Sequence, residues 1–206
     1  MFLPFLPAVA AQSPLLLNDA SVGRREYAVE LHIESENGDS ITESSLIAER
    51  HVRQFMGFQR TRYVIGSVND GGTPSYKAGT HDRDLLSPNG IGQKGARDRV
   101  PLMDPSFPDG PLTPGTEWSS NAFDNIPLLC RYVGDEEVAG RTAARITFRV
   151  DEKEKGLTFE EAYTLIDRTD ARPLQTYVRA RLEFFGRTRV LYRLRRTNVP
   201  GLSLPR

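Results

Sequence analysis

Apolar and polar side chains alternate along much of this chain, with a period of two residues. The alternation runs over residues 26–34 near the start, and over residues 142–150, 159–167, 174–185 and 189–195 in the second half. Successive side chains of a β-strand point to opposite faces of its sheet, so this period is typical of a strand with one buried face. The pattern therefore predicts a mainly β protein.

Short polar stretches separate the predicted strands, and strands joined by such turns run antiparallel. Polar outer faces at regular spacing predict a curved antiparallel sheet or open half-barrel with an apolar concave face. Residues 44–57 match neither period well, so a bulged strand and a short helix are both open there, and an α+β fold is the alternative. Residues 71–116 predict a long proline- and glycine-rich loop with at most one weak strand.

Two tight turns stand back to back within residues 107–118, which read FPDGPLTPGTEW. The second has proline where a φ near −65° is needed and glycine where a positive φ is needed, which predicts a type II turn. The only tryptophan of the chain follows three residues later. We expect a rigid structural corner formed by Pro108, Gly110, Pro114, Gly115 and Trp118.

The chain of 206 residues suits one domain, which we place at residues 25–198, with 199–206 as a frayed tail or linker. Residues 1–12 end in small side chains at the spacing of a signal-peptide cleavage site, although their apolar run is short and no cation precedes it. We interpret them as the remnant of a signal peptide, the alternative being an apolar N-terminal arm. No segment reaches the roughly 20 apolar residues of a membrane-spanning helix.

Acidic and basic residues balance at 27 each, so no attraction to nucleic acid is expected. Every basic residue after Arg168 is nevertheless an arginine, and arginine binds carboxylates and phosphates through its planar fork. These arginines are either a solvated strand face or a surface that faces an anion. If two were directly opposite one another, either the register would stagger them or an anion would lie between them. The candidates for an anion or partner surface are Arg179, Arg181, Arg189, Arg193 and Arg195.

The opposite face of the same two strands is apolar. Its residues are either plain core or the lining of a concave site for an acyl chain. They are Val178, Leu182, Phe184, Val190 and Tyr192.

The sequence offers little catalytic chemistry. The cluster His81–Asp84 matches no established metal spacing, so a solvated turn is expected there. Cys130, the only cysteine, follows an apolar run and is expected to be buried. We predict no catalytic residue, cofactor or metal, and hence no enzyme. A pair of carboxylates for glycan hydrolysis is set by folding, and its candidates are Asp104, Asp109, Glu117 and Asp124.

The run 107–118 resembles a stretch upstream of the peptidoglycan-binding domain in spirochaete-type OmpA-like envelope proteins. The similarity extends, through the order of strands and turns, over roughly residues 25–198. No counterpart of the peptidoglycan-binding domain follows Thr197, so the resemblance does not imply that activity. It implies a β-rich fold and a location in a bacterial envelope. A looser likeness is to the open half-barrels of periplasmic lipoprotein and lipid carriers.

Together these features predict an exported protein, periplasmic or associated with the outer membrane. The leading hypothesis is a non-enzymatic binding or interaction module for an envelope protein or an anionic envelope component. The alternatives are a carrier of a lipid or acylated ligand on the concave face, and a cell-wall glycan hydrolase.

Overall fold

The computed structural model describes residues 13–70, 77–91, 106–122, 126–150, 156–183 and 187–206. Within them, one short 3-10 turn, Asp19–Ser21, precedes ten β-strands, and no α-helix is present. The strands are β1 Gly23–Glu34, β2 Ser40–Gln54, β3 Gly57–Asn69, β4 His81–Leu86, β5 Glu117–Ala122, β6 Ile126–Val138, β7 Arg141–Val150, β8 Leu157–Asp167, β9 Pro173–Leu182 and β10 Thr188–Arg196.

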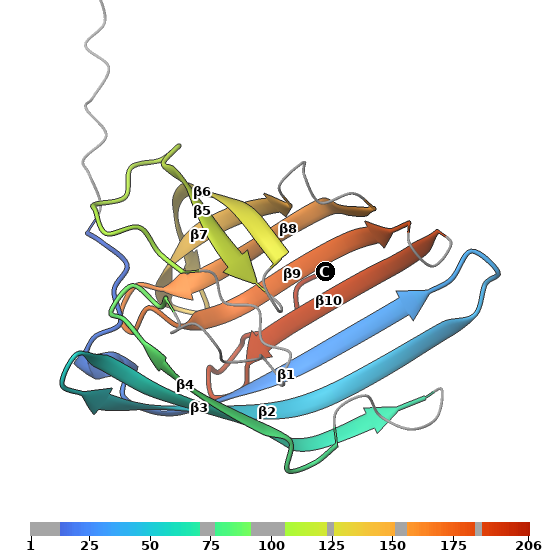
Figure 1. Cartoon of the computed structure of the whole chain (residues 1–206), viewed down its shortest axis with the longest axis horizontal. Coiled ribbons are helices and arrows are strands. Elements are labelled where there is room, and N and C mark those ends of the chain that lie inside the picture. The colour runs from blue at the N-terminus through green and yellow to red at the C-terminus, as the bar shows by residue number, and fades with distance from the viewer. Residues whose placement is uncertain (1–12, 71–76, 92–105, 123–125, 151–155, 184–186) are drawn as a thin grey trace, which may run out of the picture.

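All ten strands form one antiparallel sheet in the order β4-β3-β2-β1-β10-β9-β8-β7-β6-β5 (Figure 1). The sheet is curved and its two edge strands, β4 and β5, are not paired with each other, so it is an open half-barrel as predicted. The central pair joins β1 to β10, the first and last strands of the chain. The ambiguous residues 44–57 lie in the long strand β2 and the turn after it, and the bulge falls on β3, at Ile65.

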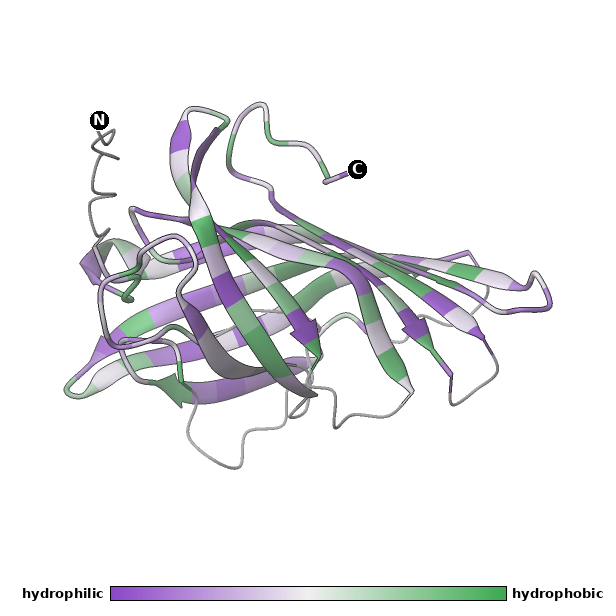
Figure 2. Cartoon of the chain, turned by 90° about the horizontal axis from the view of Figure 1, so that it is seen from above, coloured by the Kyte–Doolittle hydropathy of each residue, from purple (hydrophilic) through white to green (hydrophobic). Residues whose placement is uncertain are grey.

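Hydrophilic and hydrophobic residues alternate along the strands (Figure 2). The inner, concave face carries one continuous core that extends from Phe58 on β3, through Tyr27 on β1, to Leu128 on β6. Leu15 and Leu112, from segments outside the sheet, are part of the same core. Residues from both halves of the chain therefore bury one shared apolar surface.

Hydrogen bonds between loops hold one end of the half-barrel together. Leu17 N donates to Pro88 O at 2.6 Å, and Phe107 N donates to Asn89 O at 2.8 Å. Leu15, Leu17, Phe107 and Leu112 are buried against the inner face at this end, which we call the plugged end.

The predicted corner belongs to the plugged end. Thr116 N donates to Thr113 O at 2.8 Å, and Gly115 has a φ of 96°, which fits the type II turn expected from the Pro114-Gly115 pair. Trp118 is partly buried, and its Nε1 donates to Ser106 O at 2.7 Å. The corner thus fixes where β5 enters the sheet.

The C-terminal segment covers part of the outer, convex face. Val199 and Leu202 are buried there in a second apolar cluster with Leu165 and Leu174. Gln175 Nε2 also donates to Ser203 O at 2.6 Å. This segment is therefore packed and not frayed as expected, because its apolar residues Val199 and Leu202 have a face of the sheet on which to pack.

Candidate functional site

The predicted arginine surface lies on the outer face of β9 and β10, and carboxylates of neighbouring strands accompany much of it. Arg181 Nη2 lies 2.5 Å from Glu160 Oε1, and Arg179 Nε lies 3.3 Å from Glu160 Oε2. Arg193 is ion-paired with Glu30 across the β1–β10 pair. These ion pairs compensate much of the positive charge.

The register staggers some arginines and aligns others. Arg193 is opposite Tyr177 and Arg195 is opposite Gln175, whereas Arg189 is directly opposite Arg181. Side chains opposite each other in an antiparallel pair have Cβ atoms about 5 Å apart, and like charges in such positions repel. Two of the predicted residues therefore come together as an unfavourable pair unless other charges compensate them.

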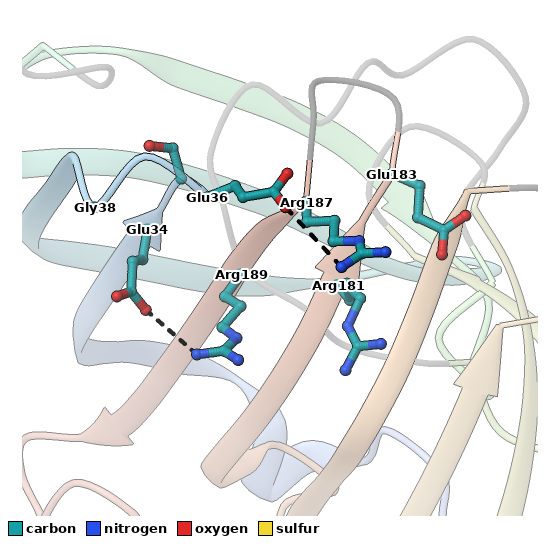
Figure 3. Close-up of a pocket in the computed structure, with 8 residues that line it drawn as sticks. Glu34, Glu36, Gly38, Arg181, Glu183, Arg187 and Arg189 are labelled. Carbon is teal, nitrogen blue, oxygen red and sulfur yellow. Dashed lines mark ion pairs between the residues drawn. The ribbon is translucent and has the colours of Figure 1, made fainter.

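A pocket of about 550 Å³ surrounds this aligned pair, at the end of the sheet where the β1–β2 and β9–β10 connections lie. We call it the rim pocket (Figure 3). Its lining consists of Glu34, Ser35, Glu36, Gly38, Arg181, Glu183, Arg187 and Arg189.

Ion pairs across the rim pocket are long. Arg189 Nη1 lies 3.9 Å from Glu34 Oε2, and Arg187 Nη1 lies 4.0 Å from Glu36 Oε1 (Figure 3). Arg189 is 72% exposed and Arg187 80%. Exposed ion pairs of this kind contribute little, typically under about 1 kcal/mol. The guanidinium groups of Arg187 and Arg189 therefore remain accessible to a ligand, whereas that of Arg181 is paired with Glu160 at 2.5 Å.

The predicted apolar residues lie on the inner face of the same strands, directly behind the arginines. Val178 and Tyr192 are opposite each other and are buried, whereas Val190 and Leu182 are only half-buried. Phe184 lies outside the described residues.

Strand register extends these residues into rows across four strands. The rows, from the middle of the sheet toward the rim, are Leu31–Tyr192–Val178–Ala162, then Ile33–Val190–Ala180–Phe159, then Thr188–Leu182–Leu157. Burial decreases along this direction. The preceding row, Val29–Leu194–Thr176–Thr164, is buried throughout. In the two rows nearest the rim, Ala180 and Thr188 are still buried, whereas the other five residues are half-buried: Ile33, Val190, Phe159, Leu182 and Leu157. We call the half-buried part of the inner face the open end.

Polar residues bound the open end on the β2 side. Ser45 and Ser67 are opposite each other on the inner face of β2 and β3, and Ser67 Oγ donates to Glu43 Oε1 at 2.8 Å. These polar residues interrupt the apolar surface on β2 and β3, although Ile41 on β2 lies opposite Ile33 on the same face and is 43% exposed.

A buried charge network lies deeper along the inner face. Arg62 Nε and Arg172 Nη2 each donate to the Glu49 carboxylate at 2.8 Å, and Arg196 donates to Asp170 at 3.0 Å. Arg172 reaches Glu49 from the β8–β9 turn, so the network ties distant strands together. Because each of these charged groups has a buried partner, we assign the network a structural role.

The residues His81–Asp84, expected to form a solvated turn, instead lie on strand β4. Asp82 and Asp84 point inward and are each only 8% exposed. Arg60 Nε on β3 donates to Asp84 Oδ1 at 3.1 Å. The sequence indicated at most one weak strand in this region, because the inward positions carry charge and hydrophobic periodicity cannot reveal a buried ion pair.

The described residues contain no group of three His, Cys, Asp or Glu side chains that could hold a metal ion. Cys130 is fully buried, as expected, and burial raises the pKa of its thiol to about 12. Asp109 accepts a hydrogen bond from Asn89 Nδ2 and lines a different pocket from Glu117, so these two carboxylates do not converge. Asp104 and Asp124 lie outside the described residues.

Comparison with known proteins gives only distant similarities. No family model matches the chain, and no curated protein matches it. A domain from Vibrio parahaemolyticus, described in connection with outer membrane lipoprotein sorting, has a TM-score of 0.27 and 13% identity, with 88% of this chain and 87% of that chain covered. A LolA superfamily protein from Nitrosomonas europaea has a TM-score of 0.28 and 7% identity, with 84% of each chain covered. Values this low define neither a family nor a function.

Within the part of the chain that the structure describes, no helix has the length and apolar character needed to cross a membrane.

Proposed function

We propose that the protein is a non-enzymatic binding module of the cell envelope that carries an acyl chain on the open end of its inner face. The observation that carries the proposal is the gradient of burial along that face. At the plugged end, Leu15 and Leu112 from outside the sheet are buried in the core against the strands. At the open end, apolar side chains such as Val190 and Phe159 are half-buried, although they point to the same concave side.

A bound acyl chain would cover this remaining apolar surface. Removing apolar surface from water gains about 25 cal/mol per Å². The half-buried apolar residues lie on adjacent strands of the inner face, next to the polar residues Glu43, Ser45 and Ser67. An apolar surface that continues across neighbouring strands favours an apolar ligand such as an acyl chain.

Two features of the sequence support an envelope location. Residues 1–12 have the small side chains of a signal-peptide cleavage site, and the corner 107–118 resembles envelope proteins. We propose a periplasmic site of action on these grounds.

An interaction module that binds an anionic partner through the arginines of β9 and β10 is the second candidate. The aligned pair Arg181 and Arg189 favours it. The ion pairs of Arg179, Arg181 and Arg193 with neighbouring glutamates disfavour it, because a partner would have to displace those carboxylates.

The test is native mass spectrometry of the protein, purified gently from its own envelope fraction. We expect a mass increment equal to a lipid or an acylated molecule. Val190→Asn, on the inner face, should abolish this increment. Leu191→Asn is the matched control, because the neighbouring residue points to the outer face and is opposite His32 and Arg179.

Circular dichroism of both variants verifies that they fold. A bare wild-type chain, or one with a protein attached in place of a lipid, would refute the carrier proposal and favour the interaction module. Equal loss of the lipid in both folded variants would also refute it.

A further inference from the structure

We propose that the rim pocket binds a zwitterionic group, a phosphate next to an ammonium, and that this group is the head of the carried ligand. The second part of this inference rests on the proposed function, since the acyl chain is placed on the open end. The first part stands on the rim pocket alone.

The arginines of the pocket supply the site for a phosphate. Arg181 and Arg189 are directly opposite on neighbouring strands, and Arg187 immediately precedes β10. Planar guanidinium groups bind phosphate oxygens in pairs. Arg187 and Arg189 are the groups open to a phosphate, since their own ion pairs are long and exposed, and Arg181, already paired with Glu160, adds a third cation beside them.

The carboxylates of the pocket supply the site for an ammonium. Glu34, Glu36 and Glu183 line the same pocket, so three negative charges balance three positive ones. A bare dianion would face all three carboxylates, and a bare cation would face all three guanidinium groups. A ligand that carries both charges side by side fits both sets, so the lining favours a zwitterion over either ion alone.

Size and position agree with a lipid head. The pocket volume of about 550 Å³ lies within the usual range of small-molecule sites, about 300–1,000 Å³. Glu34, Arg181 and Arg189 are also the immediate sequence neighbours of Ile33, Leu182 and Val190, which form the open end. Neighbouring residues of a strand are about 3.3 Å apart and point to opposite faces, so a ligand that crosses the rim reaches both surfaces.

The test measures binding by isothermal titration calorimetry with soluble head compounds and with single-chain amphiphiles of equal chain length. Glycerophosphocholine tests the rim pocket without an acyl chain, and inorganic phosphate tests for a simple anion site. A lysophosphatidylcholine and an uncharged monoacylglycerol, both below their micelle concentrations, test the head and the chain together.

Arg189→Gln and Glu183→Gln remove one charge of each sign from the rim pocket. Arg195→Gln is the matched control, since Arg195 is on the outer face of the same strand but does not line the pocket. We expect each pocket variant to bind lysophosphatidylcholine about tenfold more weakly than the wild type, which is the effect of losing one charge-assisted contact. Monoacylglycerol binding should be unchanged, and the control should bind both amphiphiles like the wild type.

Four results would overturn the inference, either at the rim pocket itself or at its link to the carried ligand. Inorganic phosphate that binds as tightly as glycerophosphocholine would show a simple anion site. If glycerophosphocholine does not bind, the rim pocket is not a site for a zwitterionic group. If the pocket variants bind lysophosphatidylcholine like the wild type, the head of the ligand does not bind in the rim pocket. The carrier proposal would then still be supported by monoacylglycerol binding. Glycerophosphocholine binding without any amphiphile binding would keep the pocket and refute the carrier.

Discussion

Glu49 lies on the inner face of β2 with 2% of its surface exposed, and three side chains contact its carboxylate. Burial alone would raise the pKa of Glu49, but the guanidinium of Arg172, the ring of His51 and the guanidinium of Arg62 outweigh it. Together they hold the pKa well below its ordinary value. The carboxylate therefore stays ionised inside the protein, and folding depends on its charge.

This lowered pKa predicts acid sensitivity. A carboxylate with a lower pKa in the folded state stabilises the fold above its unfolded pKa, and that stability is lost as the pH falls below it. We expect the free energy of unfolding to decrease progressively as the pH falls below about 5. Glu49→Gln should cost about 3–5 kcal/mol at neutral pH, because it leaves buried guanidinium groups without their charge partner.

Urea unfolding of the wild type and of Glu49→Gln over a series of pH values measures both effects. Glu26→Gln is the control, since Glu26 pairs with Arg24 at the protein surface. A Glu49→Gln variant as stable as the control would contradict the structural role of the network.

The Cys130 thiol should be unreactive in the folded protein. It is fully buried between the strands of the inner core, and burial raises its pKa to about 12. Only the thiolate reacts with alkylating reagents, so both access and ionisation oppose the reaction. We expect iodoacetamide to label the native protein at mildly alkaline pH far more slowly than the urea-unfolded protein, as measured by mass spectrometry. Equal labelling rates would contradict the buried position.

At the scale of single elements, Gly57 lets β3 begin next to β4. A Cβ atom added at Gly57 would lie 2.1 Å from Leu86 O, a backbone atom of β4. Gly57→Ala should therefore push the two strands apart and destabilise the protein by about 1–3 kcal/mol or more. Gly66→Ala on the same strand is the control, because its Cβ would have no atom within 4 Å. Thermal unfolding of both variants checks this, and equal melting temperatures would refute it.

The strands that could be predicted from the sequence are those whose inner faces are apolar, such as β7 and β10. Strand β4 could be predicted only as one weak strand without defined bounds, because Asp82 and Asp84 occupy its inward positions. The fold class followed from alternation and short turns, which are local properties. The pairing of β1 with β10 brings together residues more than 150 positions apart, and no local pattern encodes it.

The same limit applies to the candidate site. Arg181 and Arg189 could be found because the strands of one hairpin pair with each other. Glu34 and Glu36 could not, since they reach the rim pocket only through the pairing of the first and last strands. On a solvated outer face, polarity alone also does not separate a ligand site from ordinary surface.

At the scale of the whole molecule, an open sheet of ten strands is held in one curved shape by a single inner core. The two edge strands β4 and β5 do not pair with each other. Contacts between loops replace that pairing at the plugged end, where Asn89 O accepts from Phe107 N and Asn89 Nδ2 donates to Asp109. The segments that fill the plugged end should therefore stabilise both halves of the sheet together.

Leu112 provides a test of this coupling. It belongs to the segment before β5, is fully buried, and lies in the core shared by β3 and β6. Leu112→Ala should cost about 2–5 kcal/mol, whereas Leu85→Ala, at a position 42% exposed on β4, should cost under about 1 kcal/mol. Trp118 fluorescence reports on β5, and far-ultraviolet circular dichroism reports on the whole sheet. Because one core unites both edges, the urea-unfolding transitions followed by these two signals should move to lower urea by the same amount and remain coincident. Transitions that separate in Leu112→Ala would show that β5 and its neighbours unfold as a unit of their own, and that the plugged end does not couple the two edges.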